Sequence, residues 1–187
     1  MLAMLPTMHT EIVNAAHVTG DPQARQRFAR DAHRILFGLV RDGAALGWVD
    51  PPSEVEVAEL MDEILAAVSV GDASLRAAYV DDVLVGLGYW SRYARPTHRP
   101  HADIEKIAVN PSAQGMGIGR ALTAALVDDA RAAGVEVLTL DARGDNIAAL
   151  SLYESLGFAE YGRLPRFVAF GERRYDKVFM MIDLRST

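Results

Sequence analysis

The sequence predicts an α/β protein in which a twisted mixed sheet of about six to seven strands carries helices on both faces. Two observations predict this class. Apolar residues recur at helical spacing over residues 21–70, and short apolar runs typical of strands alternate with helical patterns after them. One such run leads into glycines at positions 115, 117 and 119 and then into a helical pattern, which indicates a strand, a tight loop and a helix.

A single domain is expected over residues 1–187. The chain is long enough for one well-buried core and short for two, and it contains no repeat, low-complexity tract or linker. We expect the N-terminal helices at about 21–70, the central core at about 75–160 and a closing hairpin at about 162–184.

The first elements follow from capping signals. Residues 10–18 have the β-branched and apolar composition of a strand. Asp21 and Pro22 then favour a helix start, and the glycines that follow residue 42 mark its end. Ser53 and Glu56 form a capping box for a second helix, which Gly71 closes.

A hairpin of residues 75–80 and 83–93 comes next, with two glycines in its second arm that indicate a bulge or a close backbone approach. The prolines of residues 94–100 predict a loop. Residues 101–109 are expected as a strand that leads into the glycines, and the following helix extends to Gly134.

The remaining elements complete the sheet. The nearly continuous apolar run 135–140 predicts a central strand. A short helix begins at Asn146 and ends at Gly157. Residues 164–170 and 175–184 then read as the closing hairpin.

The glycine loop has the features of an anion site. Glycines let the backbone approach a bound group closely and adopt conformations that a side chain would forbid. The first turn of the following helix has unpaired N–H groups and the positive end of the helix dipole, so a phosphate is the natural ligand.

Composition excludes several classes of function. With no cysteine there is no disulfide, no thiolate nucleophile and no cysteine-ligated metal, and the scattered histidines lack ligand spacing, so no metal is expected. The net charge of −6 argues against nucleic acid and mildly favours a cationic acceptor. No apolar run is long enough for a membrane span, and residues 1–6 lack the basic residues of a signal peptide, so we expect a cytoplasmic protein without a membrane partner.

Two other phosphate-binding folds fit less well. A dinucleotide-binding oxidoreductase would need a third glycine, but Arg120 and Leu122 stand at the two places where it would fall. A P-loop is excluded because no Gly-Lys-Ser/Thr sequence is present.

Two motifs resemble the GNAT superfamily of acetyl-CoA-dependent N-acetyltransferases. The first is a Gln/Arg-x-x-Gly-x-Gly/Ala loop, matched by Gln114, Gly117 and Gly119. The second is Asn-x-x-Ala-x-x-x-Tyr followed by Gly-Phe, matched by Asn146, Ala149, Tyr153, Gly157 and Phe158. The resemblance implies the GNAT fold, in which the coenzyme lies in a splay between two strands.

The resemblance also implies which residues bind acetyl-CoA, the cosubstrate. The backbone around the loop would hold the pyrophosphate, through Gln114, Gly115, Met116, Gly117, Ile118, Gly119 and Arg120. The pantetheine arm would lie along Ile107, Ala108 and Val109, with the Val109 N–H as the donor to the thioester carbonyl. Asn146 would bind the coenzyme, cap its helix, or do both.

Three residues are candidates for catalysis. An amine acceptor arrives mostly as ammonium and must lose a proton before it attacks. Strand alternation places Asp103, Glu105 and Ile107 on one face and Lys106 on the other. Glu105 is the first candidate base and Asp103 the second, although both could instead pair with a neighbouring cation. Tyr153, by the resemblance, would protonate the departing thiolate; otherwise it is a core aromatic residue.

The expected function is transfer of the acetyl group to a primary amine, by direct attack through a tetrahedral intermediate. A small-molecule acceptor is expected, in a pocket formed by the N-terminal helices, the 94–100 loop and the hairpin around Arg166 and Phe167. The alternatives are acetylation of a protein N-terminus or lysine, and a non-catalytic acetyl-CoA sensor. A homodimer is also compatible with the sequence.

Overall fold

The computed structural model describes residues 9–185, so the expectation about residues 1–6 lies outside the described part. The strands are β1 Thr10–Asn14, β2 Ala73–Val80, β3 Val83–Arg92, β4 His101–Val109, β5 Val137–Arg143, β6 Ala159–Phe170 and β7 Arg173–Asp183. The helices are α1 Ala15–Thr19, α2 Pro22–Arg41, α3 Glu54–Ser69, α4 Ile118–Ala132 and α5 Ile147–Ser155.

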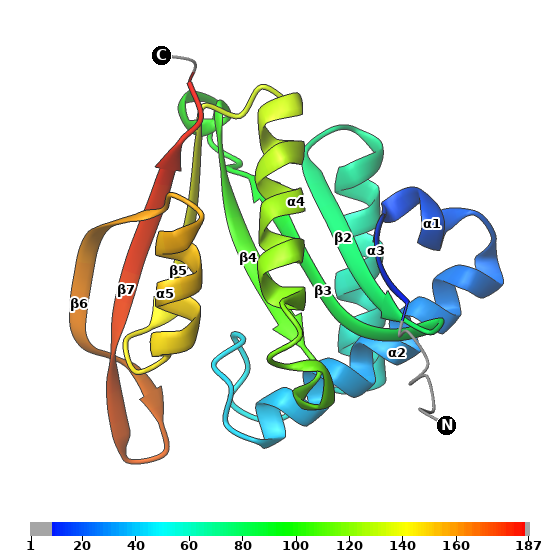
Figure 1. Ribbon diagram of the computed structural model, residues 1–187, viewed down its shortest axis with the longest axis horizontal. Coiled ribbons are helices and arrows are strands. Elements are labelled where there is room, and N and C mark those ends of the chain that lie inside the picture. The colour runs from blue at the N-terminus through cyan, green and yellow to red at the C-terminus, as the bar shows by residue number, and fades with distance from the viewer. Residues whose placement is uncertain (1–8, 186–187) are drawn as a thin grey trace, which may run out of the picture.

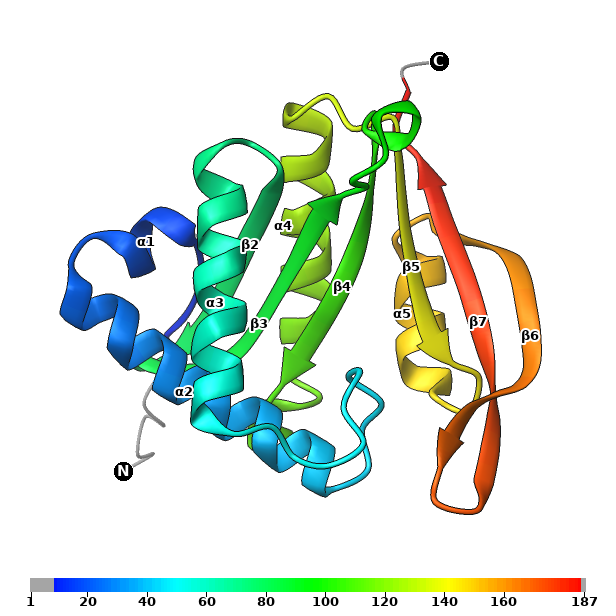
Figure 2. The ribbon, with the colours of Figure 1, turned by 180° about the vertical axis from the view of Figure 1, so that it is seen from behind.

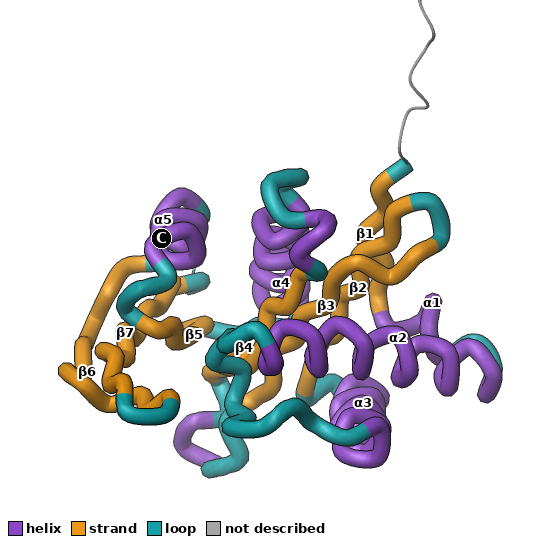
Figure 3. Tube along the Cα trace, turned by 90° about the horizontal axis from the view of Figure 1, so that it is seen from below, coloured by secondary structure: helices purple, strands orange, loops and turns teal. Residues whose placement is uncertain are grey.

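The strands form one seven-stranded sheet in the order β1-β2-β3-β4-β5-β7-β6, and they are antiparallel except for the pair β4–β5 (Figure 1). Seen end-on, α4 and α5 lie above the sheet while α2 and α3 lie below it (Figure 3). The predicted mixed α/β sheet with helices on both faces is therefore confirmed. The prediction of one domain over residues 1–187 stays a prediction.

The two long N-terminal helices begin where their capping residues predict. The Asp21 side chain accepts hydrogen bonds from the backbone N–H groups of Gln23 and Ala24, and Pro22 is the first residue of α2. Ser53 and Glu56 form the predicted capping box at the start of α3. These local contacts determine where each helix starts, and the apolar face of each helix determines what it packs against.

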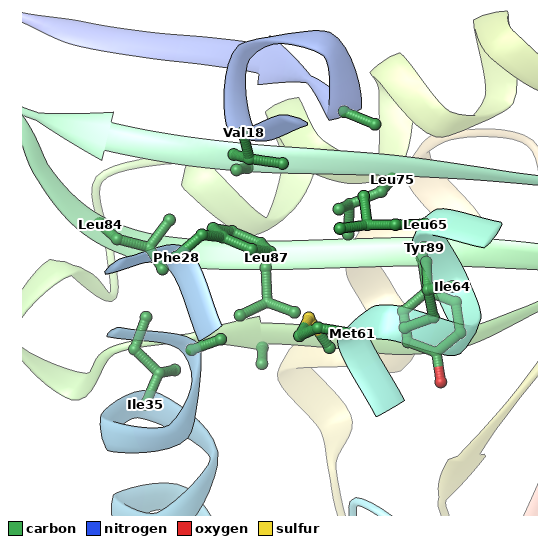
Figure 4. Close-up of a cluster of buried hydrophobic side chains, with 14 of the residues drawn as sticks. Val18, Phe28, Ile35, Met61, Ile64, Leu65, Leu75, Leu84, Leu87 and Tyr89 are labelled. Carbon is green, nitrogen blue, oxygen red and sulfur yellow. The ribbon is translucent and has the colours of Figure 1, made fainter. Parts of the chain in front are cut away.

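The lower core is built by α2 and α3 against β2 and β3. Phe28 of α2, Met61 of α3 and Leu87 of β3 are almost fully buried and point toward one another (Figure 4). Each side chain of this size contributes about 1.5–3 kcal/mol when it is withdrawn from water. This packing holds the N-terminal helices against the half of the sheet that ends at β4.

On the upper face, α4 packs closely on β3 because two residues of that strand have no side chain. A Cβ atom on Gly88 would lie 2.6 Å from Ile107 Cδ1 and 3.2 Å from Leu126 Cδ1. One on Gly86 would lie within 3.3 Å of Leu122 and Ile118. The predicted close approach is therefore confirmed, and it sets the height of α4 above the sheet.

Three predicted boundaries are wrong. The expected strand 10–18 ends at Asn14, whose side chain accepts from the Ala16 N–H and starts helix α1. Strand β5 extends past residue 140 to Arg143, because it pairs with β7 to that point. Strand β6 begins at residue 159 rather than 164, since β7 also pairs with its first half. Partner strands, which a local pattern does not reveal, decide these ends.

The pairing of β4 with β5 is short. Four residues of each strand are paired, 101–104 with 137–140, and the parallel ladder then stops. Beyond Ile104 the two strands diverge, as seen from behind in Figure 2. The sheet therefore opens in its middle, toward the end at which α4 begins.

No helix within residues 9–185 is long and apolar enough to cross a bilayer.

Candidate active site

A cleft of about 490 Å³ lies where β4 and β5 diverge. One wall is the second half of β4, and the other is formed by residues 140–143 of β5 together with α5. The loop after α2, residues 44–47, also lines the cleft, as do Gln114 and Gly119 at the start of α4. The cleft is thus lined by segments that are far apart in the sequence, and seven of the fourteen predicted site residues line it.

The glycine loop lies at the N-terminus of α4. Gly115 and Gly117 have φ angles of +81° and +78°, the left-handed region that side chains disfavour. Gly117 is the N-cap of α4, and no side chain caps this helix. The first N–H groups of α4 are therefore free of a side-chain cap, and the space beside Gly115 and Gly117 is open. This arrangement fits an anionic group such as a pyrophosphate.

The other loop residues take different positions. Gly119, unlike Gly115 and Gly117, does not have a left-handed φ angle. An added Cβ at Gly119 would meet Leu152 Cδ1 of α5 at 3.5 Å, an ordinary van der Waals contact, so the fold does not require a glycine there. Arg120 donates through its side chain to Ser155 Oγ of α5. Met116 is exposed and Ile118 is buried, so their side chains lie outside the cleft lining. Their contribution to an anion site is through the backbone.

The exposed backbone of β4 alternates between two directions. A Cβ on Gly86 would lie 3.1 Å from the carbonyl oxygen of Ala108, and one on Gly88 would lie 3.1 Å from that of Lys106. Ala108 and Lys106 therefore turn their peptide groups toward β3. Asn110 likewise donates to Val85 O at 2.7 Å. Because successive residues of a strand alternate, the N–H groups of Ile107 and Val109 face the cleft. They are the donors available to a ligand lying along β4.

A β-bulge in β4 changes which side chains share a face. Tyr89 of β3 pairs with Lys106 but Trp90 pairs with Ile104, so Glu105 is an extra residue. Glu105 accepts from Ser91 Oγ at 3.1 Å, and Lys106 lies over the ring of Tyr89. Since Tyr89 and Ser91 are two apart on one strand, Glu105 and Lys106 lie on the same face.

The prediction from simple alternation, which placed Glu105 and Ile107 on one face of the strand and Lys106 on the other, is therefore wrong. Beyond the bulge the phase is reversed: Ile107 packs with Ala102 and Ile104 in the upper core, and Ala108 packs with the lower helices. The bulge thereby brings an acid and a base together at the cleft. Nothing in a single-strand pattern indicates where an extra residue is inserted.

The two candidate bases have different surroundings. Glu105 is exposed and lines the cleft. Asp103 lies behind it and does not line the cleft; it accepts a hydrogen bond from Thr139 Oγ1, and Tyr93 Oη lies 2.7 Å from the same hydroxyl. Burial raises the pKa of Asp103 to about 6, and the nearby Glu105 charge acts in the same direction. Of the two, Glu105 is placed to meet a ligand in the cleft.

Tyr153 is in the cleft wall. It belongs to α5, is 9% exposed, and packs against Phe158 with ring centroids 6.0 Å apart. Burial, with a smaller effect of Asp141, raises the pKa of Tyr153 to about 12. The phenol is therefore protonated at neutral pH and available as a hydrogen-bond donor. Tyr153 is thus a packed aromatic residue that also borders the cleft, and its role in protonating a thiolate stays a prediction.

Asn146 caps α5, because its Oδ1 accepts from the Ala149 N–H at 3.2 Å, and it also lines the cleft. Gln114 donates from Nε2 to Val109 O at 3.4 Å, which ties the glycine loop to the end of β4. Both residues thus position the backbone around the cleft.

Three cationic residues of the cleft were not expected from the sequence. Lys177 pairs with Asp141 at 2.9 Å, and Arg143 pairs with Asp145 at 2.6 Å. Lys106 instead lies over the ring of Trp48, with its Nζ 4.7 Å from the ring centroid. These residues come from β7, β5 and β4, and only the order of strands in the sheet brings them together.

The expected acceptor pocket is only partly as predicted. The end of α2 and the loop after it border the cleft. The 94–100 loop precedes the first residue of β4 and lies at the other end of that strand, away from the cleft. Phe167 is 60% exposed, and Lys177 Nζ lies 6.0 Å from its ring centroid. The hairpin therefore approaches the cleft through Lys177.

Among residues 9–185, no group of three or more histidine and carboxylate side chains is arranged to hold a metal ion.

A family model and two relatives that match this sequence are all acetyltransferases. The model for the acetyltransferase (GNAT) family matches residues 7–158. The [ribosomal protein bS18]-alanine N-acetyltransferase of Escherichia coli K12 is 39% identical over 83 residues, which are 44% of this chain and 56% of that protein. The L-methionine sulfoximine/L-methionine sulfone acetyltransferase of Salmonella typhimurium is 38% identical over 79 residues, 42% of this chain and 46% of that protein. The matches thus span about half the length of these relatives.

The fold is shared with solved structures. A GNAT superfamily phosphinothricin acetyltransferase from Sinorhizobium meliloti, in complex with acetyl-CoA, superimposes with a TM-score of 0.79. The comparison covers 93% of this chain and 88% of that one at 24% identity. The likeness therefore concerns the fold.

Proposed function

Because the chain belongs to the acetyltransferase (GNAT) family, we propose that it transfers the acetyl group of acetyl-CoA to a primary amine. One observation carries this proposal: an uncapped helix N-terminus with left-handed glycines borders a cleft that is also lined by unpaired β4 backbone and by Tyr153. An anion site, a strand edge and a proton donor are the parts that a bound acyl thioester of this kind requires.

The residues fit acetyl-CoA as follows. The backbone of residues 114–120 holds the pyrophosphate, where several N–H donors converge at the positive end of α4. The N–H groups of Ile107 and Val109 bind the pantetheine arm and the thioester carbonyl. When bound, acetyl-CoA supplies an activated acetyl group with a thiol as the leaving group.

Glu105 and Tyr153 divide the proton transfers. Glu105 lines the cleft and takes the proton from the ammonium form of the acceptor, directly or through water. The neutral phenol of Tyr153 donates a hydrogen bond to the sulfur as negative charge develops on it, and it passes its proton to the departing thiolate. Asp103, behind Glu105, is the second candidate base. No acyl-enzyme intermediate is needed, since positioning of the amine and the thioester is enough for direct attack.

The acceptor is proposed to be a small molecule. The loop of residues 44–47 lines the cleft together with the candidate base Glu105. Among the relatives, one acts on L-methionine sulfoximine and L-methionine sulfone and another on a ribosomal protein alanine. Acetylation of a protein N-terminus or lysine is therefore the alternative.

The first experiment measures thiol release from acetyl-CoA with amino acids, polyamines, amine-bearing antibiotics and short peptides as acceptors. Acetylation of small amines supports the proposal. Turnover with peptides alone moves it to the protein-modifying alternative. Binding of acetyl-CoA without any turnover leaves the non-catalytic sensor.

Tyr153→Phe tests the mechanism. We expect kcat to fall about 100-fold or more, as is typical for loss of a general acid, while the Kd for acetyl-CoA changes little. Steady-state rates and calorimetry measure the two quantities. An unchanged kcat would remove Tyr153 from the proton transfer.

A cytoplasmic location and a homodimer are further parts of the proposal. Sedimentation of the purified chain measures the second directly, and a monomer at micromolar concentration would reject it.

A further inference from the structure

The cleft holds three cations, and one of them has no ion-pair partner among the described residues. The ion pairs that Lys177 and Arg143 make with Asp141 and Asp145 account for two of them. For Lys106, the described contacts of its ammonium are the rings of Trp48 and Tyr89, at 4.7 and 5.9 Å. A cation–π contact recovers only part of the hydration that a half-buried ammonium loses.

Burial, in keeping with this, lowers the pKa of Lys106, and Glu105 is the charged group that acts against the shift. An anion that enters the cleft would supply the missing partner. Lys106 thus feels the charge of Glu105 but forms no ion pair within the described residues, which leaves its ammonium available to a negative group of a ligand.

The bulge places this cation beside the candidate base. Glu105 and Lys106 lie on the same face of β4 and both line the cleft. A ligand that places its ammonium group at Glu105 would therefore bring the atoms next to that group close to the Lys106 side chain. In a regular strand the two side chains would point to opposite faces, so the insertion at Glu105 is the feature that pairs them.

We propose that the acceptor is an α-amino acid, whose amino group lies at Glu105 and whose carboxylate is bound by Lys106. This inference rests on the proposed acetyltransferase function and narrows its acceptor to one chemical class. The transfer itself is unchanged: the N–C bond of the amide forms and the C–S bond of the thioester breaks. The ammonium gives one proton to Glu105 before it attacks, Tyr153 gives its proton to the thiolate, and the second proton that the nitrogen loses restores the phenol, directly or through water.

The test compares acceptors that differ only in the carboxylate. L-amino acids, their amides and the amines left by decarboxylation are assayed with the wild type, Lys106→Met and Lys106→Arg. Ratios of kcat/KM between acid and decarboxylated amine are compared across variants, so the intrinsic reactivity of each amine cancels.

Loss of a charge-assisted contact predicts that Lys106→Met lowers the acid-to-amine ratio by about 10- to 100-fold, mainly through KM, and that Lys106→Arg retains it. Lys177→Met is the matched control: it removes the other cleft lysine, which already has a carboxylate partner, and should keep the wild-type ratio. If Lys106 only tethered the loop around Trp48, acid and amine would lose activity together and the ratio would stay constant.

The outcomes separate the inference from the function on which it rests. A wild-type enzyme that acetylates amides, peptides or plain amines as well as it acetylates amino acids overturns the inference but keeps the acetyltransferase activity. An acid-to-amine ratio unaffected by Lys106→Met overturns it as well. If acetyl-CoA binds but no amine is acetylated, both proposals fail.

Discussion

Asp103 and Glu105 are two residues apart on β4, yet only one of them faces the cleft. Glu105 is exposed and lines the cleft, whereas Asp103 is half-buried, accepts a hydrogen bond from Thr139 and does not line the cleft. Carboxylates that are chemically alike thus acquire different roles from their positions.

The raised pKa of Asp103 makes stability depend on pH. The value is about 6 in the folded protein and 3.8 in the unfolded reference, mainly because of burial. Between these values the folded chain binds more protons, so its free energy of unfolding falls as pH rises. Asp103→Asn removes this loss.

Relative to the wild type, Asp103→Asn should therefore gain about 1–2 kcal/mol between about pH 4 and pH 7, a value reduced for partial solvent screening. Urea unfolding at each pH measures the difference. A difference that is constant with pH would show that Asp103 ionises normally.

The sequence allowed residue-level predictions wherever a role depends on local geometry. Asn146 and Tyr153 are seven apart on one short helix, and both border the cleft. Lys106 was assigned to the wrong face, because its position depends on an extra residue relative to β3. Arg143 and Lys177 could not be assigned, since their strands are separated by α5 and β6 in the chain.

Helix α4 has a left-handed glycine near each end. Gly117 has a φ of +78° at its N-cap, and Gly134 a φ of +69° just after its C-cap. An added Cβ would meet nothing within 4 Å at either position. A residue other than glycine would therefore adopt an unfavourable left-handed conformation at either position, but only Gly117 belongs to the proposed pyrophosphate site.

This symmetry yields a matched pair of variants. Gly117→Ala and Gly134→Ala should each lower the free energy of unfolding by about 1–2 kcal/mol, the cost of the left-handed conformation for alanine. Only Gly117→Ala should also weaken acetyl-CoA binding, by about 10-fold or more, because it changes the backbone N–H groups of the loop. Equal affinities of the two variants, measured by calorimetry, would contradict the assignment of the loop.

Element starts were predictable where a side chain caps a helix, as at Asp21 and Ser53. The bounds of the strands were less predictable in the C-terminal half, because the pairing of β6 with β7 determines where each of them begins and ends. Asn14 shows the limit of composition: the residues after it suit a strand, but its side chain starts a helix.

At the scale of the whole molecule, the two halves of the sheet are joined by four paired residues on each of β4 and β5 and by the upper core, which contains residues of β4, β5, α4 and α5. Strands β1–β4 pack with the N-terminal helices, while β5–β7 pack with α5. A ligand lying along β4 between these halves would contact both, and its binding would stabilise the folded chain as a unit.

Amide hydrogen exchange tests this arrangement. Without ligand, the Ile107 and Val109 amides, which face the cleft, should exchange faster than those of Lys106 and Ala108, which face β3. Addition of acetyl-CoA should slow the first pair by about 10-fold or more and leave the second nearly unchanged. Uniform protection of all four amides before addition would contradict the splayed strand.

The strand order has a consequence for the order in which the chain is made. Strand β7 lies between β5 and β6 but follows both in the sequence. During synthesis β5 lacks its second neighbour and β6 has none at all until β7 has left the ribosome. The backbone groups of β6 that later pair with β7 are meanwhile free to contact chaperones or other chains. The second wall of the cleft is therefore completed late, and a newly made chain acquires its site only when the sheet closes around β7.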